Sequence, residues 1–470
     1  MKIKSNNPQL TRRRFLRTSA AAGAVVAGFP NIMPSSVLGA DAPSKKIQIA
    51  QIGCGRIAHE MDLPGILKHD VARVVIVCDL DSKRMAHAKK FVEDHYNKKK
   101  GGENAVSVKI NGDFREVIKD PSIDAVAIST PDHWHSEIVV AAALAGKDVY
   151  VQKPLSMTIA EGRVVSDTVR AKDRIFQIGS QQRADSPWPQ FRRAVELVRN
   201  GRLGKLQTVK IGLPTDPSGK DEPEMPIPSN LNYEMWQGWT PLAPYTEKRV
   251  HPQNDFGRPG WLRIDPYCLG MITAWGSHHV DIAHWGMDTE YSGPIEIEGK
   301  AEFPKSGLWN VHGAYHVEAK YANGVTVIID DKFPNGVRFE GADGWLFVSR
   351  GGGRATASDP SNTEGQALAA SSPKIIESKI GPNEIHLHAS KDHHLDWLIS
   401  IQTRKPAATN AEIAHRSTSA CILAWTAMKL GRKLRWDPAK ETFVDDNEAN
   451  AMRTRAQRSP YGTEHWVKKA

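Results

Sequence analysis

From residue 47 onward, short apolar runs alternate with helix-length segments that mix apolar and polar residues. The apolar runs have the length of strands and lie at residues 47–52, 74–78, 124–129 and 147–151. Segments typical of helices separate them, at residues 61–70, 82–98 and 137–145. An uninterrupted apolar run is typical of a strand that is buried on both faces. This order therefore predicts a doubly wound parallel sheet covered by helices.

A second pattern begins with a strand-like run at residues 206–213. Further strand-like runs follow at residues 295–303, 311–321, 324–330, 337–339 and 345–348. Hairpin signals such as Asn323-Gly324 separate some of them, which predicts an open, largely antiparallel sheet. Amphipathic helices are expected at 390–404 and 411–431. We therefore expect an α/β domain followed by an α+β domain.

The first apolar run ends in a G-x-G-x-x-A turn, and the second ends in Asp79. Gly53 permits a tight turn, and Gly55 has no side chain to keep the backbone away from a pyrophosphate. Ala58 is small enough for the next helix to pack on the strand. A carboxylate at Asp79 would accept the ribose hydroxyls and repel a 2′-phosphate. The pattern predicts a Rossmann domain that binds NAD, with NADP less favoured.

Two later strands end in polar residues, at Thr130-Pro131-Asp132-His133-Trp134-His135 and at Gln152-Lys153-Pro154. In doubly wound sheets ligands bind at the carboxyl ends of the strands. We therefore expect the cofactor to contact Thr130, Pro131, His135, Gln152 and Lys153. A cis Lys153–Pro154 bond is expected, and the ammonium could hold a substrate hydroxyl or help to move its proton. A surface lysine is the alternative interpretation of Lys153.

The formal net charge of the 470 residues is +9, and most of it lies in the first forty residues, which carry no acid. The rest is nearly balanced, so charge gives no reason to expect binding to nucleic acid or to a membrane surface. Residues 11–17, Thr-Arg-Arg-Arg-Phe-Leu-Arg, match a twin-arginine export signal. The apolar segment 20–29 after it is too short for a stable membrane span, and small residues near Ala40 suit cleavage.

We therefore expect the twin-arginine translocase to export the folded protein to the periplasm or the cell exterior. A disordered basic tail is the alternative interpretation of the first forty residues. Outside the cytoplasm there is no nicotinamide pool to exchange with, so the cofactor would be tightly held and recycled in place, or would be structural.

The four cysteines, Cys54, Cys78, Cys268 and Cys421, show no metal-binding spacing and are expected to be free, mostly buried thiols. The long Pro-rich segment 214–262 contains four aromatic residues, Trp236, Trp239, Tyr245 and Trp261. They could stack on a sugar ring or anchor the segment to its own domain.

A helix is expected at residues 274–285, where His278 and Asp281 share one face and would point into the crevice. A histidine and a carboxylate one turn apart can share a proton. A satisfied interior histidine is the alternative interpretation of His278. His279 and His284 lie off that face and are expected to be structural. No metal site is predicted, because the histidines of this helix do not form a zinc motif.

The G-x-G-x-x-A turn, the Thr-Pro-x-x-x-His loop, the x-Lys-Pro strand end and Gly179-Ser180-Gln181-Gln182-Arg183 occur in that order. In this the chain resembles the Gfo/Idh/MocA oxidoreductases, especially their exported bacterial branch, which has a longer carboxyl-terminal domain. The family includes glucose–fructose oxidoreductase and inositol 2-dehydrogenase. The resemblance implies hydride transfer between a carbohydrate or polyol and a nicotinamide cofactor.

The resemblance also implies roles for individual residues. His278 matches the catalytic histidine and Asp281 the later acid of the family pattern D-x-G-x-H-x-x-D, with Lys153 as the third catalytic residue. The first acid of that pattern is replaced by Ala274, and the usual Glu before Lys-Pro is replaced by Gln152. Further cofactor contacts are expected at Arg56, Ile57 and Arg84.

The domain boundaries follow from these assignments. We expect a signal peptide at residues 1–40, the NAD(P)-binding domain at 41–180, the substrate domain at 181–440 and a C-terminal tail at 441–470. The family resemblance implies that the late helices return to the Rossmann domain, and any homo-oligomer should form through the open sheet.

The sequence is compatible with three functions. The first is NAD(P)-dependent oxidation or reduction of a sugar or polyol. The second is redox-neutral glycoside cleavage, in which a tightly held NAD oxidises the sugar transiently and reduces it again after elimination. The third is a sugar-binding protein that keeps NAD structurally.

Overall fold

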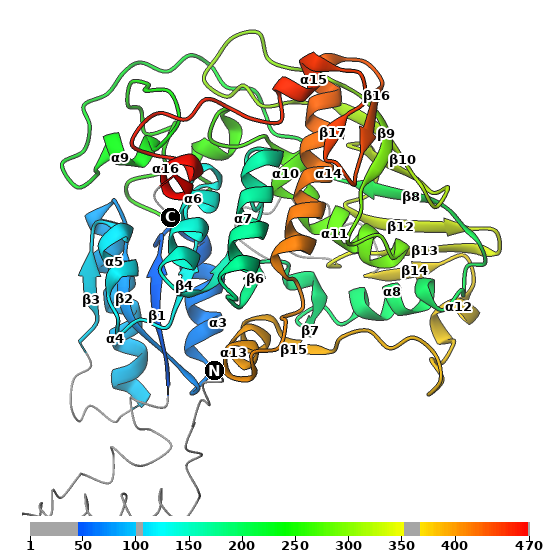
Figure 1. The fold of residues 1–470 in the computed structure, drawn as a ribbon, viewed down its shortest axis with the longest axis horizontal. Coiled ribbons are helices and arrows are strands. Elements are labelled where there is room, and N and C mark those ends of the chain that lie inside the picture. Colours follow the sequence, from blue (N-terminus) through cyan, green and yellow to red (C-terminus); the bar gives the residue numbers. More distant parts are fainter. Residues whose placement is uncertain (1–45, 100–106, 352–366, 469–470) are drawn as a thin grey trace, which may run out of the picture. The chain divides into compact units, whose positions relative to one another are not determined.

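The computed structural model describes residues 46–99, 107–351 and 367–468. The described residues from Ile47 onward form one compact unit, which contains two large sheets (Figure 1). The expected signal peptide and most of the Gly-rich stretch after Arg350 lie outside the described residues.

The first sheet has six parallel strands in the order β3-β2-β1-β4-β5-β6. Its strands are β1 (Ile47–Ile52), β2 (Ala72–Cys78), β3 (Lys109–Asn111), β4 (Ala125–Ile128), β5 (Asp148–Val151) and β6 (Phe176–Ile178). Its helices are the π-helical turn η2 (Ala58–Asp62), α3 (Leu63–Leu67), α4 (Ser82–Lys99), α5 (Phe114–Lys119), α6 (Asp132–Leu144) and α7 (Ile159–Ala171). The predicted doubly wound sheet is confirmed.

Burial on both faces explains why β1, β2, β4 and β5 are continuous apolar runs, whereas the edge strand β3 is exposed. One face packs against α6 and α7 through residues such as Ile138 and Val165. The other face packs against α3, α4 and α13 (His393–Thr403), with Trp397 fully buried there. The sheet can therefore meet a ligand only at the ends of its strands.

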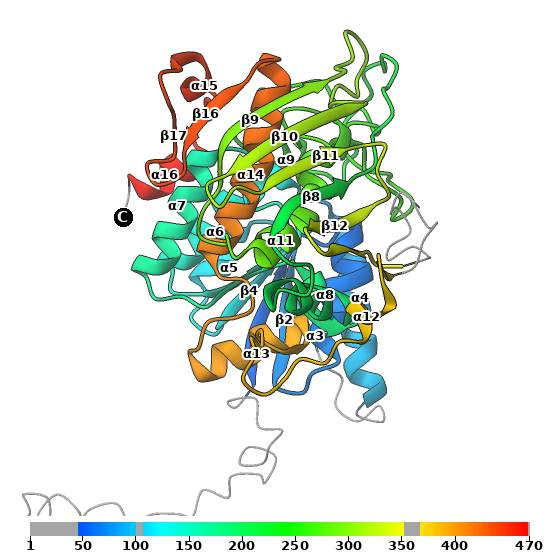
Figure 2. The same cartoon turned by 90° about the vertical axis from the view of Figure 1, so that its right-hand side faces the viewer.

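The second sheet has nine strands in the order β14-β13-β12-β8-β11-β10-β9-β16-β17. Their bounds are β8 (Leu206–Gly212), β9 (Pro294–Ala301), β10 (Tyr315–Tyr321), β11 (Thr326–Asp330), β12 (Gly336–Gly341), β13 (Gly344–Val348), β14 (Leu368–Ala370), β16 (Leu434–Asp437) and β17 (Thr442–Phe443). The β8–β11 pair is parallel and the other pairs are antiparallel, which confirms the expected open, largely antiparallel sheet. Figure 2 looks onto this sheet, with α11 (Gly276–Met287) and α14 (Ala411–Leu430) behind its strands.

Shorter elements complete the second part of the chain. They are η3 (Gln181–Arg183), α8 (Gln190–Arg199), α9 (Tyr233–Gln237), η4 (Gly260–Arg263), α10 (Met271–Ala274), α12 (Pro373–Glu377), α15 (Asn447–Ala451) and α16 (Thr463–Val467). A separate two-stranded parallel sheet joins β7 (Ala184–Ser186) to β15 (Ser390–Asp392).

Helix α14 connects the two sheets. It packs on α7 beside the first sheet and on β9 of the second, and Figure 1 shows it in orange next to α7. Its N-cap is Asn410, which accepts a hydrogen bond from the backbone N–H of Ile413, and it ends at Gly431 in the left-handed region. This helix is almost wholly buried, as a link between two layers must be.

The last residues pack back onto the first sheet's helices. Glu137 on α6 accepts hydrogen bonds from the backbone N–H of Gly462 (2.6 Å) and from Trp466 Nε1 (3.1 Å). Helix α16 lies on α6. The segment that we expected to be a tail is therefore an integral part of the fold.

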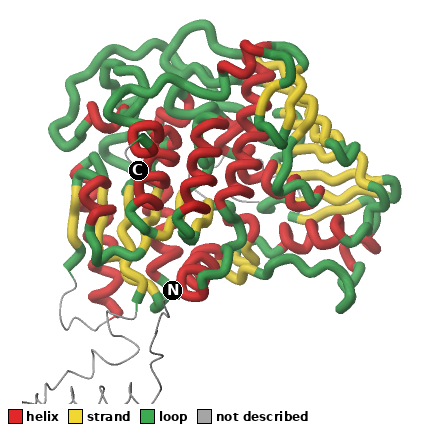
Figure 3. The backbone as a smooth tube through the Cα atoms, viewed as in Figure 1, coloured by secondary structure: helices red, strands yellow, loops and turns green. Residues whose placement is uncertain are grey.

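Most of segment 214–262 is irregular, and Figure 3 draws it mainly in green between β8 and the helices that follow. Trp236, Tyr245 and Tyr267 form a small apolar core of their own with their neighbours. Trp239 donates its indole N–H to the carbonyl of His133. These aromatic residues anchor the segment, which leaves Trp261 as the partly exposed one of the four that we singled out.

Candidate functional site

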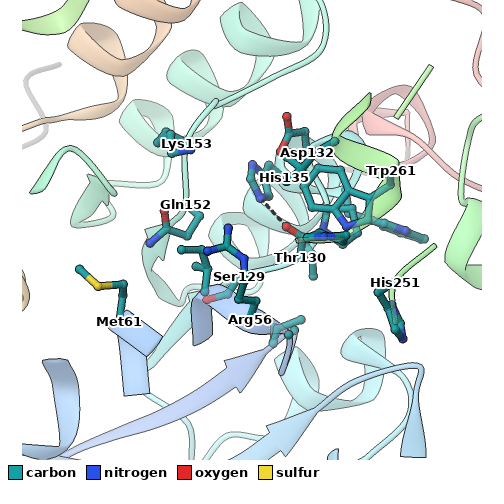
Figure 4. Close-up of a pocket in the computed structure, with 18 of the residues that line it drawn as sticks. Arg56, Met61, Ser129, Thr130, Asp132, His135, Gln152, Lys153, His251 and Trp261 are labelled. Carbon is teal, nitrogen blue, oxygen red and sulfur yellow. Dashed lines mark hydrogen bonds between the residues drawn. The ribbon is translucent and has the colours of Figure 1, made fainter. Parts of the chain in front are cut away.

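A pocket lies at the carboxyl ends of the first sheet's strands. Its walls come from the β1–η2 turn, the ends of β2, β4 and β5, segment 214–262 and the start of α11. Figure 4 shows Arg56, Gln152, Lys153 and His135 around it, with the hydrogen bond between His135 and Thr130 dashed. Every residue that we expected to bind the cofactor lines this pocket.

The glycine turn leaves open space where a pyrophosphate would sit. Gly53 has φ = +84°, and a Cβ there would lie 2.6 Å from the carbonyl carbon of Ser129. A Cβ at Gly55 would meet nothing within 4 Å, although Gly55 lines the pocket. Thr130 adds a hydroxyl that is buried without a hydrogen-bond partner. These residues fit a dinucleotide, with Arg56 and Ile57 beside the turn.

Asp79 stands at the end of β2 and is held by backbone groups. Its Oδ2 accepts from the N–H of Cys54 (2.6 Å) and its Oδ1 from the N–H of Asp81 (2.8 Å). Burial raises the pKa of this carboxyl, and these hydrogen bonds oppose the shift. Each carboxylate oxygen keeps a second lone pair, so Asp79 can still accept a ribose hydroxyl.

Part of segment 214–262 closes over the β2–α4 turn, and we call residues 228–257 the strap. Asp81 receives hydrogen bonds from Asn230 Nδ2 (2.8 Å) and His251 Nε2 (2.9 Å). Although burial raises the pKa of Asp81, these two bonds hold it at about 2. Backbone bonds from Ser82 N–H to Asn230 O (2.9 Å) and from Asn232 N–H to Leu80 O (3.0 Å) join the same two segments.

Arg84 and a ring stack fasten the strap farther along. The guanidinium donates to the carbonyls of Pro252 (2.8 Å) and Asp255 (3.1 Å). It also lies 4.8 Å from the ring centroid of Phe256, which stacks on His59 at 4.6 Å. Arg84 thus lines the pocket while it binds the strap, a role that its sequence position did not reveal.

Lys153 projects from the end of β5, and its peptide bond to Pro154 is cis, as expected. The ammonium donates to the carbonyl oxygen of Ala274 at 2.8 Å. Burial lowers the pKa of Lys153 to about 8, and the nearby Asp132 carboxylate opposes that shift. At residue 274 the family pattern has an acid, whereas in this chain Ala274 contacts Lys153 through its backbone carbonyl.

Asp132 belongs to the loop at residues 130–135, but its sequence position did not indicate a role for it. Helix α6 begins at Asp132, earlier than the expected start at Glu137, because Pro131 has the extended backbone typical of an N-cap. The carboxyl lines the pocket, and its Oδ2 is buried without a hydrogen-bond partner. Burial raises its pKa to about 7, although Lys153 opposes the shift. An acid in the first turn of a helix was the available signal.

His135 and Gln152 are held from behind the pocket. The two ring nitrogens of His135 lie against carbonyl oxygens, Nδ1 at 2.6 Å from Pro154 O and Nε2 at 2.9 Å from Thr130 O. Burial lowers the pKa of His135 to about 4. Gln152 donates to Oδ1 of the fully buried Asp62 at 2.8 Å. The amide that replaces the family's usual acid therefore acts as a donor to an acid on η2.

His278 lines the pocket, and its Nδ1 is buried without a hydrogen-bond partner. Burial lowers its pKa well below the ordinary value, and the charges of Arg350 and Lys153 lower it further. The imidazole is therefore neutral near pH 7, with one ring nitrogen unprotonated.

Asp281 does not share the pocket with His278, and the expectation that it would was wrong. Its two oxygens accept from Arg183 Nε and Nη2, both at 2.7 Å, and both side chains are buried. Three residues advance about 300° around a helix, so the two side chains diverge by about 60°. That divergence turns Asp281 toward η3, where Arg183 neutralises it.

The neighbouring histidines are structural, as expected. His279 Nε2 bonds with Asn335 Oδ1 (2.8 Å), and His284 Nε2 bonds with the hydroxyl of Tyr321 (2.7 Å).

Arg350 follows the end of β13 in the second sheet and forms part of the pocket wall. Its guanidinium carbon lies 4.1 Å from the ring centroid of Trp188 and 4.6 Å from that of Trp275. All three side chains line the pocket. Sequence reasoning missed them, because nothing along the chain shows that residues 188, 275 and 350 meet.

The four cysteines are buried and free, as predicted. Within the described ranges, no three His, Cys, Asp or Glu side chains are grouped to hold a metal ion. No helix in that part of the chain has both the length and the apolarity needed to cross a membrane.

Two family models match the chain. Residues 47–180 match "Oxidoreductase family, NAD-binding Rossmann fold", and residues 207–352 and 376–463 match "Oxidoreductase family, C-terminal alpha/beta domain". The inositol 2-dehydrogenase 1 of Saccharopolyspora erythraea is 27% identical over 304 residues, which is 64% of this chain and 84% of that protein. The myo-inositol 2-dehydrogenase of Thermotoga maritima is 33% identical over 168 residues, but the match spans only 44% of that protein and 35% of this chain.

Solved structures show the same fold at low identity. The aldose-aldose oxidoreductase of Caulobacter crescentus, complexed with glycerol, has a TM-score of 0.55 at 17% identity and covers 83% of this chain and 99% of its own. The WlbA dehydrogenase of Bordetella pertussis, in complex with NADH and UDP-GlcNAcA, has a TM-score of 0.57 at 15% identity, with 84% and 98% covered.

Proposed function

Because the chain belongs to the Gfo/Idh/MocA oxidoreductase family, we propose that it moves hydride between a carbohydrate or polyol and a tightly held NAD. The single observation that supports this best is the half-buried ammonium of Lys153, which lines the same pocket as the glycine turn and His278. Sugar and polyol dehydrogenases among the relatives support the substrate class.

The chain's own residues would handle the proton. Lys153 keeps a positive charge below about pH 8 and would hold the reacting hydroxyl through a donor that Ala274 does not use. The neutral His278 would take the hydroxyl proton during oxidation and return it during reduction. Bound NAD would supply the hydride acceptor or donor at its nicotinamide ring.

One observation favours the redox-neutral alternative. Asp132 has a pKa of about 7, so a protonated carboxyl is present in the pocket near neutral pH. Such a group could protonate the leaving oxygen of a glycoside, as elimination from a transient keto-sugar requires.

The two functions are separated by one experiment. The purified protein is incubated with sugars, polyols and their glycosides, while nicotinamide absorbance and released aglycone are followed together. Net reduction of the cofactor supports the dehydrogenase, and cleavage without it supports the alternative. A protein that contains NAD and does neither would be a binding protein.

Lys153 and His278 should act as one proton-handling unit. Lys153→Met should abolish turnover and leave NAD bound, because the glycine turn is unchanged. His278→Ala should slow turnover about 10²–10⁴-fold, and the double variant should be little slower than the poorer single one. Near-normal turnover by Lys153→Met would contradict the proposed mechanism.

The pH profile should depend on Asp132. We expect kcat/KM to fall as the pH rises through about 8, because Lys153 then loses its proton. The Asp132 charge raises the pKa of Lys153, so Asp132→Asn should move this alkaline limb of the kcat/KM profile to lower pH. A limb that stays in place or moves upward would show that Lys153 is not the titrating group.

Asp79 should make the protein prefer NAD. The native protein should bind NAD about a hundredfold or more tightly than NADP, because a like-charge contact costs several kcal/mol. Asp79→Ser should lose most of this preference, and Asp79→Asn, which keeps the shape, separates charge from packing. Equal dissociation constants for the two cofactors in the native protein would refute the assignment.

The strap should slow cofactor release. An Asn230→Ala/His251→Ala variant loses two hydrogen bonds to the Asp81 carboxylate, so NAD should dissociate roughly tenfold faster or more. The control is Lys248→Ala, which removes the exposed pair between this strap residue and Glu222, a residue outside the strap. Exchange of bound NAD for labelled NAD gives both rates, and identical rates would exclude retention by the strap.

We also propose export by the twin-arginine route, supported by residues 11–17 alone. Replacing Arg12 and Arg13 with Lys should leave the precursor in the cytoplasm, as fractionation and immunoblotting would detect. Undiminished export of that variant would remove the reason for expecting a retained cofactor.

A further inference from the structure

We propose that Asp62 is a positioning residue, which acts on the pocket through the side-chain amide of Gln152. Its carboxylate holds this amide so that the amide oxygen can accept a hydroxyl of a bound ligand, while the residue beside Lys153 stays uncharged. The proposal rests on the proposed function, because it concerns how that same site receives its ligands. Gln152 lines the pocket, and Asp62 stands behind it at the end of η2.

Asp62 is fully buried, and its carboxylate is held from three other parts of the chain. Oδ1 accepts from Gln152 Nε2 at 2.8 Å and lies 3.1 Å from His394 Nε2 of α13. Oδ2 accepts from Ser129 Oγ at 2.6 Å and from the same Gln152 amide at 3.1 Å. His394 can approach because Gly65 has no side chain, since a Cβ there would lie 2.3 Å from its Nδ1. A carboxylate offers about four acceptor positions, so these contacts fix it in place.

The same network reaches the glycine turn. Gln51 Nε2, on β1, donates to Ser129 Oγ and to the carbonyl of Gly53, both at 2.9 Å. Asp62 itself is the last residue of η2, and single π-helical turns are frequent at functional sites. The acid therefore links the turn that is expected to bind the pyrophosphate to the strand end that carries Lys153.

Asp62 decides which way the amide of Gln152 faces. A carboxylate can only accept hydrogen bonds, so Gln152 must turn Nε2 toward it and Oε1 away from it. A Cβ on Gly179 would lie 2.8 Å from Oε1, so this glycine leaves room for the amide. Both side-chain hydrogen bonds of Gln152 to described residues are made by Nε2. Figure 4 shows Gln152 next to Lys153 at the pocket, where Oε1 can accept a hydroxyl of the cofactor ribose or of the substrate.

The arrangement also determines where the negative charge lies. Burial lowers the pKa of Lys153 to about 8, and the Asp132 carboxylate opposes that shift. An acid at residue 152 would add a second negative charge in the pocket and raise the pKa of Lys153. With the acid at residue 62 and an amide at residue 152, the acceptor oxygen is kept in the pocket without that charge.

The test exchanges the two side chains. Asp62→Asn leaves one oxygen for three donors, so the amide of Gln152 can turn. The dissociation constant of NAD, measured by calorimetry, or the KM of a substrate should then rise about tenfold or more. Gln152→Glu brings two acids into contact and should cause a loss at least as large. In Asp62→Asn/Gln152→Glu the new amide can donate to the new acid, so this variant should recover most of the loss, whereas independent effects would add.

A second measurement follows the charge of Lys153 directly. The rate of its acetylation by acetic anhydride is measured against pH by peptide mass spectrometry, with Lys153→Met as the blank, and the midpoint gives its pKa. In Asp62→Asn/Gln152→Glu the acid lies in the pocket wall, so the pKa of Lys153 should rise above the native value. This readout requires neither NAD nor turnover, so its result is independent of the proposed function.

Asp148→Asn is the matched control. Asp148 is a buried acid at the opposite end of β5, where its carboxylate accepts from the N–H of Ile175 at 2.8 Å and from Arg404 Nη1 at 2.6 Å. This variant also loses a buried carboxylate from the first sheet, but at a distance from the pocket. It should keep the native NAD affinity, substrate KM and pKa of Lys153.

Two results would overturn the proposal. One is native ligand affinity and KM in Asp62→Asn, and the other is a double variant with additive losses and a native pKa of Lys153. Weaker NAD binding would assign the hydroxyl to the ribose, and a raised KM with native NAD affinity would assign it to the substrate. If Gln152→Glu fails to fold, the comparison of Asp62→Asn with the double variant decides. A native protein that transfers no hydride would contradict the proposed function, while NAD affinity and the titration of Lys153 would still test Asp62.

Discussion

The position of the Lys153 ammonium depends on both sheets at once. The lysine comes from the end of β5, and the carbonyl that receives it belongs to Ala274, the last residue of α10 beside the second sheet's helices. An ammonium in a pocket of low dielectric loses much of its hydration, which lowers its pKa toward the working range of an enzyme. Small movements between these elements would change both the hydrogen bond and the pKa, so the packing of α14 on α7 and β9 supports the chemistry from a distance.

At the other end of the pocket, near Asp79, the strap covers the expected cofactor site. The strap is fastened to the β2–α4 turn through Asp81, and Asp79 is fixed beside it by the backbone N–H of the same turn. The segment that covers the cofactor end is thus bound to the loop that is proposed to read the ribose. An exported enzyme without a cofactor pool would benefit from this arrangement, because a slow dissociation rate replaces a high concentration of cofactor.

The sequence predicted what local patterns control. Continuous apolar runs predicted the first sheet, and the spacing of Gly53, Gly55 and Asp79 predicted a turn that lines the pocket, because strand burial and turn geometry depend on adjacent residues. Asp281 was wrongly expected in the pocket, because two side chains on one helical face can still point about 60° apart. Its actual direction depends on the ion pair with Arg183, which comes from another element. The strap contact between Asp81 and His251 and the meeting of Arg350 with its two indoles are tertiary contacts that no local pattern encodes.

The replacement at residue 274 can be understood through charge. An acid there would pair with Lys153 and raise its pKa. With Ala274, the lysine is held by a neutral carbonyl, and the acid that faces it is Asp132, whose charge changes near neutral pH. Asp132 can therefore adjust the lysine's pKa as its own charge changes. The replacement therefore leaves Asp132, at the start of α6, as an acid that tunes the charge of Lys153.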